Sequence, residues 1–549
     1  MIDYGLRNFD ICKEQPVLWH YIKIVFIISF VGSSLFIFNS LYTIILNIFS
    51  KAFMKNPKEK HKNKHIIVKH FSLPCLIENK KSGLFLLIGE NEKSQNIIID
   101  EKSLYQNILI TGTIGTGKTS SAMYPFTKQL ISYNSNDSET KMGMLILDVK
   151  GNYYKKVKEF VENENREQDL IVLELGGYYK YNPLHKPNLK ASVLANRLKT
   201  ILLLFSPNNS ESFWIDKCEQ VLTECIKLCR LYNNNYVTFE EIHKLVTIDN
   251  YYLEKVKYLR ELFILNKLNR EDIYNLLTAL NFFEKEYNNL DSRTKSILKS
   301  EITRITNTFV SDYKVHSTFC PNENELNFFG FEDVVNSGKI VVLNMNISEY
   351  TDLSKIIATY LKLDFQTEAL MRLSKCNMEN ERSIAFISDE YHEYCTISDA
   401  NFFAQSRESK CINIVATQSY SSLLNTINNE SAVKVIIQNL VNKLWFRTDD
   451  IFTIESAQKQ IGKEDKEKIS KSISENAKTT NYSYFSNSLN SKDSNISESL
   501  NTYLQYDFIY DTNFFTQKLE NFTCLSFLSD GNKILTPQKI KLFPYFKKF

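Results

Sequence analysis

The sequence predicts an α/β protein with a doubly wound, mostly parallel sheet, an all-helical domain inserted into it and a transmembrane helix before it. Short apolar runs with polar ends recur along the chain, as buried parallel strands do. Between about 190 and 330 the strand pattern stops and apolar residues recur at helical spacing. Residues 24–50 form a stretch of 27 residues without a charge, where about 20 suffice to cross a bilayer as a helix.

The uncharged stretch at 24–50 is interpreted as a single membrane span. A buried core helix is the alternative, and a cleaved signal peptide fits less well because its apolar region spans only about 7–15 residues. Seven lysines lie between residues 51 and 69, against three basic residues before the span. The positive-inside rule therefore predicts a cytoplasmic body anchored in the cytoplasmic membrane. The lysine run could also be a DNA-binding arm, but next to a span the contact with lipid headgroups is favoured.

Composition excludes several classes of protein. With 43% hydrophobic and 23% charged residues among 549, the chain is neither disordered nor fibrous. Residues 1–70 carry a net charge of +6 and the other 479 residues a net charge of −3, so charge alone does not indicate a nucleic-acid partner. The ten cysteines form no Cys-x-x-Cys pair and are expected to be reduced. Cys218, Cys225 and Cys229 have helical spacing, which indicates one buried face more simply than a metal site.

The strongest motif is a glycine-rich loop at residues 107–120, NILITGTIGTGKTS, which follows an apolar run and precedes a helix-compatible segment. This is the P-loop pattern in its expected strand–loop–helix context. Glycines allow successive backbone N–H groups to turn toward phosphate oxygens. Lys118 would neutralise the β- and γ-phosphates, and Thr119 would hold Mg²⁺. The predicted nucleotide-binding residues are Gly112, Thr113, Gly115, Thr116, Gly117, Lys118, Thr119 and Ser120.

A second motif supplies the carboxylates that P-loop chemistry needs. The apolar run 384–387 predicts a buried strand, and Asp389 and Glu390 follow its carboxyl end, where open α/β sheets bind ligands. Asp389 is the predicted Mg²⁺ ligand, together with Thr119, and Glu390 the predicted general base. A helix cap is the alternative for such acidic residues. Because no Asn-Lys-x-Asp guanine signature is present, ATP is favoured over GTP.

Other segments complete the predicted sheet domain. The runs 144–151, 170–175, 339–345, 412–418 and 523–528 share the pattern of buried parallel strands. In the helical part, Phe213 and Trp214 are interpreted as core rather than as a ligand platform. Residues 470–499 contain ten serines, and a flexible loop and a polar β-hairpin both fit this composition. The final segment turns at Asp530-Gly531 and is expected to pack back on the sheet.

Taken together, the motifs resemble those of the type IV secretion coupling proteins of the TraG/TraD kind, which are membrane-anchored members of the FtsK/HerA-type hexameric ATPases with a RecA-like P-loop domain. The resemblance covers nearly the whole predicted cytoplasmic body. It rests on the ordered set of the P-loop, Asp148-Val149-Lys150-Gly151, Asn182-Pro183-Leu184, Phe213-Trp214, Asp389-Glu390, Ser406-Arg407, Ala416-Thr417-Gln418, Asn439, Asp450 and Gly462.

The resemblance implies two further catalytic residues. Arg407 would be an arginine finger that reaches a neighbouring subunit's site, and Gln418 a sensor of the γ-phosphate. A surface salt bridge for Arg407 and a satisfied sheet-edge amide for Gln418 are the alternatives. Family members usually carry two membrane spans, whereas this sequence has room for one, which puts contacts through an outer region in doubt.

The expected protein is thus a homohexameric, single-pass ATPase of the cytoplasmic membrane. It would drive single-stranded DNA with an attached relaxase, or a protein substrate, to a type IV secretion channel. A double-stranded DNA translocase and a nucleotide-binding docking receptor without motor activity are the alternatives. The predicted domains are a membrane anchor with its basic segment (1–70), the two parts of the nucleotide-binding domain (71–188 and 333–549, the latter with the Ser/Asn-rich segment 470–500) and the helical insertion (189–332).

Overall fold

A computed structural model describes residues 24–25, 83–148, 150–205, 212–345, 347–375, 378, 381–475, 480–483, 488–491 and 496–546. The chain divides into two compact units, Met1–Glu78 and Asn79–Phe549. The predicted span at 24–50 lies outside the described residues, apart from Ile24 and Val25. Among the helices of the described ranges, none combines the length and the apolar character that crossing a membrane requires.

The second unit is organised around a sheet of eleven strands in the order β2-β1-β15-β14-β9-β3-β8-β7-β4-β6-β5. From β9 to β5 all neighbours are parallel, and from β14 to β2 all are antiparallel. The predicted α/β class with a mostly parallel sheet is confirmed. The strands are β1 Phe85–Asn91, β2 Asn96–Asp100, β3 Ile108–Thr111, β4 Gly143–Leu147, β5 Leu170–Leu173, β6 Ile340–Leu343, β7 Ile384–Ser388, β8 Cys411–Thr417, β9 Asn442–Trp445, β14 Thr523–Phe527 and β15 Gln538–Leu542.

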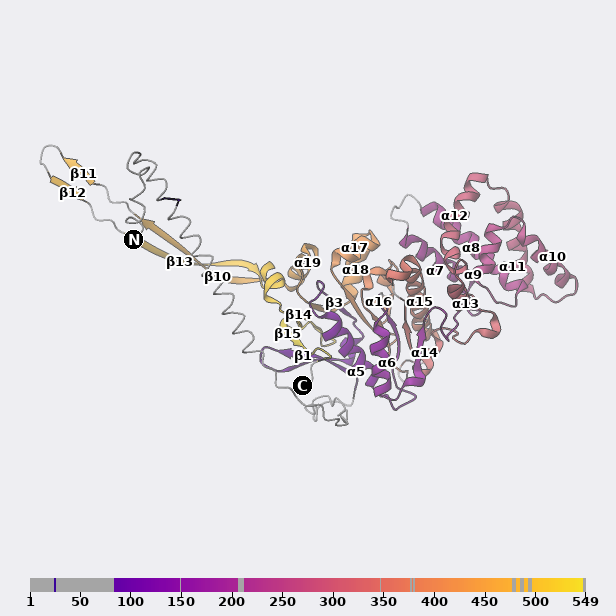
Figure 1. The fold of residues 1–549 in the computed structure, drawn as a ribbon, viewed down its shortest axis with the longest axis horizontal. Helices are drawn as coiled ribbons and strands as arrows, with labels where there is room; N and C mark the ends of the chain where they lie inside the picture. Colours follow the sequence, from indigo (N-terminus) through magenta and orange to yellow (C-terminus); the bar gives the residue numbers. More distant parts are fainter. Residues whose placement is uncertain are drawn as a thin grey trace, which may run out of the picture. The chain divides into compact units, whose positions relative to one another are not determined.

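Helices cover both faces of this sheet (Figure 1). Because successive side chains of a strand point to opposite faces, Ile108 and Ile110 pack in one core with α5 and α6, whereas Leu109 packs in a second core with α15 to α18. Burial on both sides explains why the central strands read as continuous apolar runs. The bounds are α4 Glu101–Leu104, α5 Tyr124–Ser132, α6 Tyr153–Asn163, α15 Ile347–Lys375, α16 Asp399–Gln405, α17 Tyr420–Ile427, α18 Glu430–Asn439 and α19 Ile451–Ile461.

The described residues between β5 and β6 form helices and no strand, as predicted. Most of their buried apolar side chains belong to the same core as Leu109, Leu145 and Leu147 of the sheet. Cys218, Cys225 and Cys229 are free and buried there, in agreement with one buried helix face. The proposed domain limits at residues 70, 188 and 332 stay a prediction. The helices are α7 Ala191–Leu204, α8 Ser212–Tyr232, α9 Phe239–Thr247, α10 Tyr251–Ile264, α11 Arg270–Asn281, α12 Ser292–Val310, α13 Tyr313–Phe319 and α14 Glu332–Ser337.

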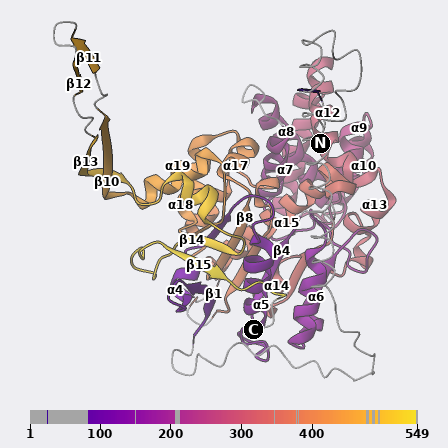
Figure 2. The ribbon, with the colours of Figure 1, turned by 60° about the vertical axis from the view of Figure 1, so that its left-hand side comes forward.

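The serine-rich segment belongs to a long β-hairpin. β10 (Lys463–Glu475) pairs with β13 (Ile496–Phe508), and the short strands β11 (Thr480–Ser483) and β12 (Ser488–Ser491) pair between them. Figure 2 shows β10 and β13 running out from α19 as a two-stranded ribbon. Of the two structures that the composition allowed, the described residues of the segment form the hairpin.

Two predictions about this unit are wrong. The run 523–528 was expected to be a parallel strand, but β14 pairs antiparallel with both β9 and β15. An apolar run reports burial on both faces and not strand direction, so the sequence pattern could not separate the two. Phe213 was expected in the core, but its side chain is 59% exposed; only Trp214 packs against the core. The expected return of the final segment is confirmed, since β15 pairs with β14 and β1.

Candidate nucleotide site

The predicted site residues gather at the carboxyl edge of the parallel strands. β3 leads into the glycine-rich loop, β7 into Asp389 and Glu390, and β8 into Gln418. β3 pairs with β8, and β8 pairs with β7. The register therefore brings three loops that are far apart in the sequence to one edge of the sheet, which is where parallel sheets bind ligands.

The glycine-rich loop is held by one hydrogen bond within the loop and by another to Arg447, which follows β9. Thr116 donates its hydroxyl hydrogen to the Thr113 carbonyl (2.9 Å), and the Thr113 N–H donates to the Arg447 carbonyl (2.9 Å). Gly115 and Gly117 have φ of +80° and +95°, in the region that favours glycine. A Cβ at Gly112 would lie 2.6 Å from Cβ of Phe446. These glycines are therefore required by backbone geometry and close packing.

Lys118 lies within this loop. Its ammonium donates to the carbonyls of Gly112 and Thr113, and the residue is only 7% exposed. Burial lowers the pKa of Lys118, against the opposing effect of the carboxylates of Glu390 and Asp389. Thr119 begins a π-helical turn, Thr119–Met123, that continues into α5. The loop thus joins a cation to the N-terminus of a helix, which is a favourable site for phosphate.

The two predicted Mg²⁺ ligands are in direct contact. The Thr119 hydroxyl donates to Asp389 Oδ2 at 2.8 Å, although 270 residues separate them. Asp389 is 1% exposed, and burial, together with the neighbouring charges of Asp148 and Glu390 and against that of Lys150, raises its pKa to about 6. A nearby cation would stabilise the ionised form of such a carboxylate.

The donor set fits Mg²⁺ in particular. One carboxylate and one hydroxyl are the protein ligands typical of a magnesium ion that also binds substrate phosphates and water. Within the part of the chain that the structure describes, no group of three or more His, Cys, Asp or Glu could hold a metal by itself. The carboxylate and the hydroxyl fit an ion that is shared with the phosphates of a nucleotide.

Glu390 is held by three neighbours. Its Oε1 accepts from Lys150 Nζ (2.8 Å), its Oε2 accepts from Gln418 Nε2 (3.3 Å), and His392 Nδ1 lies 3.8 Å from Oε2. The backbone of Glu390 is left-handed, with φ of +49°, an uncommon conformation for a residue with a long side chain. Strain of this kind gathers at functional sites. Gln418 thus lies in the site, as its proposed role as a sensor requires.

Arg407 is not part of this cluster. It lies in the turn before β8 and is exposed, whereas Gln418 follows the other end of the same strand. The seven residues of β8 separate these ends by about 20 Å. Within one chain, Arg407 therefore cannot reach the phosphate site beside Lys118.

Several residues of the site were missed or named only through the resemblance. Asp148 follows β4 and accepts from the backbone N–H groups of Lys150, Asn152 and Tyr153. The rule that found Asp389, a carboxylate at the end of an apolar run, would also have found Asp148. Phe522 packs its ring where a Cβ on Gly117 would lie, 2.5 Å away, and no pattern in the sequence indicates this contact.

A model of the type IV secretion-system coupling protein DNA-binding domain matches residues 318–500. This range contains Asp389, Glu390, Arg407 and Gln418, and the glycine-rich loop lies before it. No curated protein matches the chain.

Solved coupling proteins have a similar fold. The bacterial conjugative coupling protein TrwBdeltaN70, in its unbound monoclinic form, matches with a TM-score of 0.55 and 12% identity, over 85% of this chain and 89% of that chain. The plasmid coupling protein TrwB matches in complex with ADP and Mg²⁺ and in complex with the GTP analogue GDPNP, each with a TM-score of 0.52 and 11% identity, over 81% of this chain and 87% of that chain. In sequence over residues 318–500 and in fold over most of its length, the chain is similar to the type IV secretion-system coupling proteins, and the resemblance that its motifs predicted is confirmed.

Proposed function

We propose that this chain is a membrane-anchored, ATP-hydrolysing coupling protein that moves a substrate toward a type IV secretion channel. The contact between Thr119 and Asp389, 2.8 Å, carries the nucleotide part of this proposal. It joins the metal ligand of the phosphate loop to the carboxylate at the end of β7, which is the arrangement that P-loop hydrolysis requires. The match of residues 318–500 to a coupling-protein DNA-binding domain supports DNA as the substrate. Its single-stranded form and the attached relaxase come from the resemblance of the motifs.

Each residue of the site has a role in this mechanism. Lys118 and the N–H groups of Gly115 to Thr119 would bind the phosphates, and Thr119 and Asp389 would hold Mg²⁺, which neutralises charge on the phosphates when bound. Glu390 would take a proton from the attacking water on its carboxylate. Gln418 would sense the γ-phosphate by hydrogen bonding, and its donation to Oε2 of Glu390 would orient that carboxylate.

The position of Arg407 supports an assembly of several chains. It is exposed and lies at the far end of β8 from its own phosphate site, so it can act on a nucleotide only from a neighbouring subunit. An arginine that enters from a neighbour stabilises the charge of the transferring phosphoryl group. We therefore infer a ring, with six subunits as in the hexameric ATPases that the motifs resemble. Membrane anchoring through residues 24–50 is the part of the proposal that rests on sequence alone.

An ATPase assay on the full chain in lipid nanodiscs tests the proposal. Hydrolysis should be measured without DNA, with single-stranded DNA and with double-stranded DNA, while light scattering gives the mass of the assembly. We expect Mg²⁺-dependent hydrolysis that single-stranded DNA stimulates, in an assembly of six chains. A Lys118→Ala variant is the control and should bind no nucleotide. Preferential stimulation by double-stranded DNA would favour the translocase, and nucleotide binding without turnover would favour the docking receptor.

A further inference from the structure

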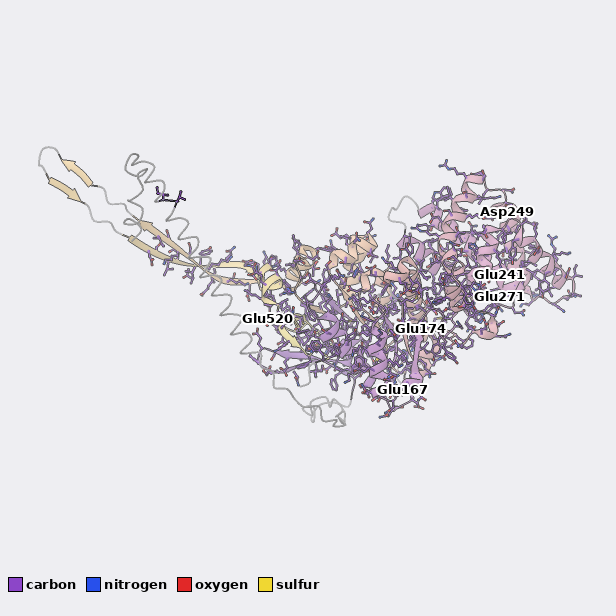
Figure 3. All side chains as sticks on the ribbon, in the orientation of Figure 1. Glu167, Glu174, Glu241, Asp249, Glu271 and Glu520 are labelled. Atoms are coloured by element: carbon purple, nitrogen blue, oxygen red, sulfur yellow. The ribbon has the colours of Figure 1, made fainter. Side chains whose placement is uncertain are left out.

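Two segments from the end of the chain pack against the phosphate loop. The Phe522 N–H donates to the carbonyl of Thr116 (3.0 Å), and the Tyr545 N–H donates to the carbonyl of Ser120 (2.9 Å). Thr116 and Ser120 lie on either side of Lys118 in the sequence. The loop around Glu520, labelled in Figure 3, leads into the first of these contacts. Phe522 and Tyr545 therefore form part of the wall of the proposed nucleotide site.

A cluster of aromatic rings connects the phosphate loop to Tyr545 and Phe546, the tail of the described chain. Phe522 and Phe546 have ring centroids 5.8 Å apart, Tyr545 and Phe546 5.5 Å, and Tyr545 and Tyr124 of α5 5.2 Å, all with edge-to-face geometry. Phe522 has a φ of +64°, a rare conformation for a bulky residue, and its ring lies against Gly117. The cluster thus has one end fixed on the phosphate loop.

The rings at the other end of the cluster are accessible to solvent. Phe546 is 54% exposed and Tyr545 is 40% exposed. The ammonium of Lys156 lies 4.7 Å from the centroid of the Tyr545 ring, so a cation already covers one face of that ring. Phe546 therefore presents the more accessible aromatic surface, and it follows Tyr545, whose N–H donates to Ser120 in the first turn of the helix that begins at Thr119.

A nucleotide needs such a surface close to its phosphates. The loop and the helix start bind phosphate, but they offer nothing to the flat, poorly hydrated faces of the base. Aromatic side chains stack on these faces without reading the hydrogen-bonding edge, so they accept different bases. Since the tail is hydrogen-bonded to Ser120, directly after Thr119, its rings lie within reach of a nucleoside whose phosphates contact Lys118.

We propose that Phe546 is the stacking platform for the purine base of the bound nucleotide, with Tyr545 and Phe522 as its support. The inference rests on the proposed nucleotide binding and deepens it. It predicts a ligand class, purine nucleoside di- and triphosphates, in which this ring selects little between adenine and guanine, so a preference for ATP must come from other groups of the site. In this arrangement the end of the chain contributes to affinity for the nucleoside and not to affinity for phosphate.

Calorimetric titration of the full chain with three Mg²⁺-bound probes tests this inference: inorganic tripolyphosphate, ADP and GDP. For Phe546→Ala we expect about a tenfold loss of affinity for ADP and for GDP, with tripolyphosphate affinity unchanged. Phe546→Tyr should restore binding of both nucleotides. Phe213→Ala, which removes an exposed ring from α8, is the matched control and should leave all three affinities as they are.

The outcomes separate this inference from the proposed function. If tripolyphosphate and ADP weaken equally in Phe546→Ala, the tail supports the loop and is no base platform. If ADP affinity does not change while the wild-type chain binds ADP, the inference is wrong and the proposed function stands. If the wild-type chain binds neither tripolyphosphate nor ADP, the proposed function fails, and the inference fails with it.

Discussion

Lys150 and Glu390 extend from the ends of two neighbouring strands, β4 and β7, and form an ion pair of 2.8 Å. The side chain of Lys150 is 50% exposed and that of Glu390 only 9%. Burial opposes ionisation of Glu390, but the hydrogen bond and the charge of Lys150 outweigh it, so the pKa of Glu390 lies below its usual value. The proposed base is thus kept ionised by a cation that solvent can reach.

Replacing Lys150 should make hydrolysis sensitive to acid. In Lys150→Met the buried Glu390 loses its partner, so its pKa rises and the base is protonated at a higher pH. The acid limb of the plot of kcat against pH should move upward, with a larger loss of rate at pH 6 than at pH 8. Lys158→Met is the control, because Lys158 forms only an exposed pair with Glu162. Identical pH profiles for Lys150→Met and the wild type would remove Lys150 from this role.

Glu390→Gln should separate binding from turnover. The amide keeps the size of the side chain but cannot accept the proton of water, so kcat should fall by about 10² to 10⁴. ADP affinity, measured by calorimetry, should stay within about twofold, because Lys118 and the loop bind the phosphates. Unchanged turnover would show that Glu390 is not the base.

Mixing two inactive variants tests the reach of Arg407. Arg407→Ala subunits keep an intact phosphate site but give no arginine to their neighbour, and Lys118→Ala subunits do the reverse. Rings that contain both should regain part of the wild-type hydrolysis rate, because some interfaces pair an intact site with an intact arginine. Mass spectrometry must show that mixed rings form; inactivity of such rings would contradict the role of Arg407 in trans.

Substitutions in the loop distinguish backbone strain from close packing. Gly115 and Gly117 both have positive φ, but a Cβ on Gly115 meets nothing within 4 Å, whereas one on Gly117 meets the Phe522 ring at 2.5 Å. Both alanine variants should cost about 1–2 kcal/mol for the left-handed backbone. Gly117→Ala should cost more, measured as a larger fall in Tm. If Phe522→Ala is added, that excess should shrink, and an excess that persists would mean that the ring is not its cause.

Lys443 in β9 should make stability depend on pH. It is 3% exposed, its ammonium donates only to main-chain carbonyls among the contacts described, at Leu440 and Val441, and burial lowers its pKa to about 8. Between pH 8 and the unfolded value near 10.4 the unfolded chain binds more protons, so this group raises stability with pH by up to about 3 kcal/mol.

Lys443→Met should remove this dependence. The variant should be more stable than the wild type at pH 7, and the difference should decline as the pH rises from 8 toward 10.5. Urea unfolding at several pH values measures it. Lys459→Met, on an exposed face of α19, is the control and should change neither the stability at pH 7 nor its pH dependence. A constant difference between Lys443→Met and wild type at all pH values would show that burial of the charge is not the cause.

The amino-acid sequence by itself was enough for the local features of this protein. Glycine at positions of positive φ predicts the phosphate loop. Apolar periodicity predicts the strands that lead into this loop and into Asp389, and the helical stretch after β5. These signals arise between residues close in the chain, where backbone geometry and burial act directly. The sequence also predicts the span at 24–50, which stays a prediction.

Only the tertiary structure decided which distant residues meet. The order of the strands brings Lys150 to Glu390 and Gln418 to the same carboxylate, and it carries Arg407 away from them to the opposite end of β8. The last strands, β14 and β15, run antiparallel to their neighbours. This path of the chain returns Phe522 and Tyr545 to the phosphate loop. Such contacts depend on strand order and direction, and the apolar pattern of a buried strand is the same whichever neighbour it pairs with and whichever way it runs.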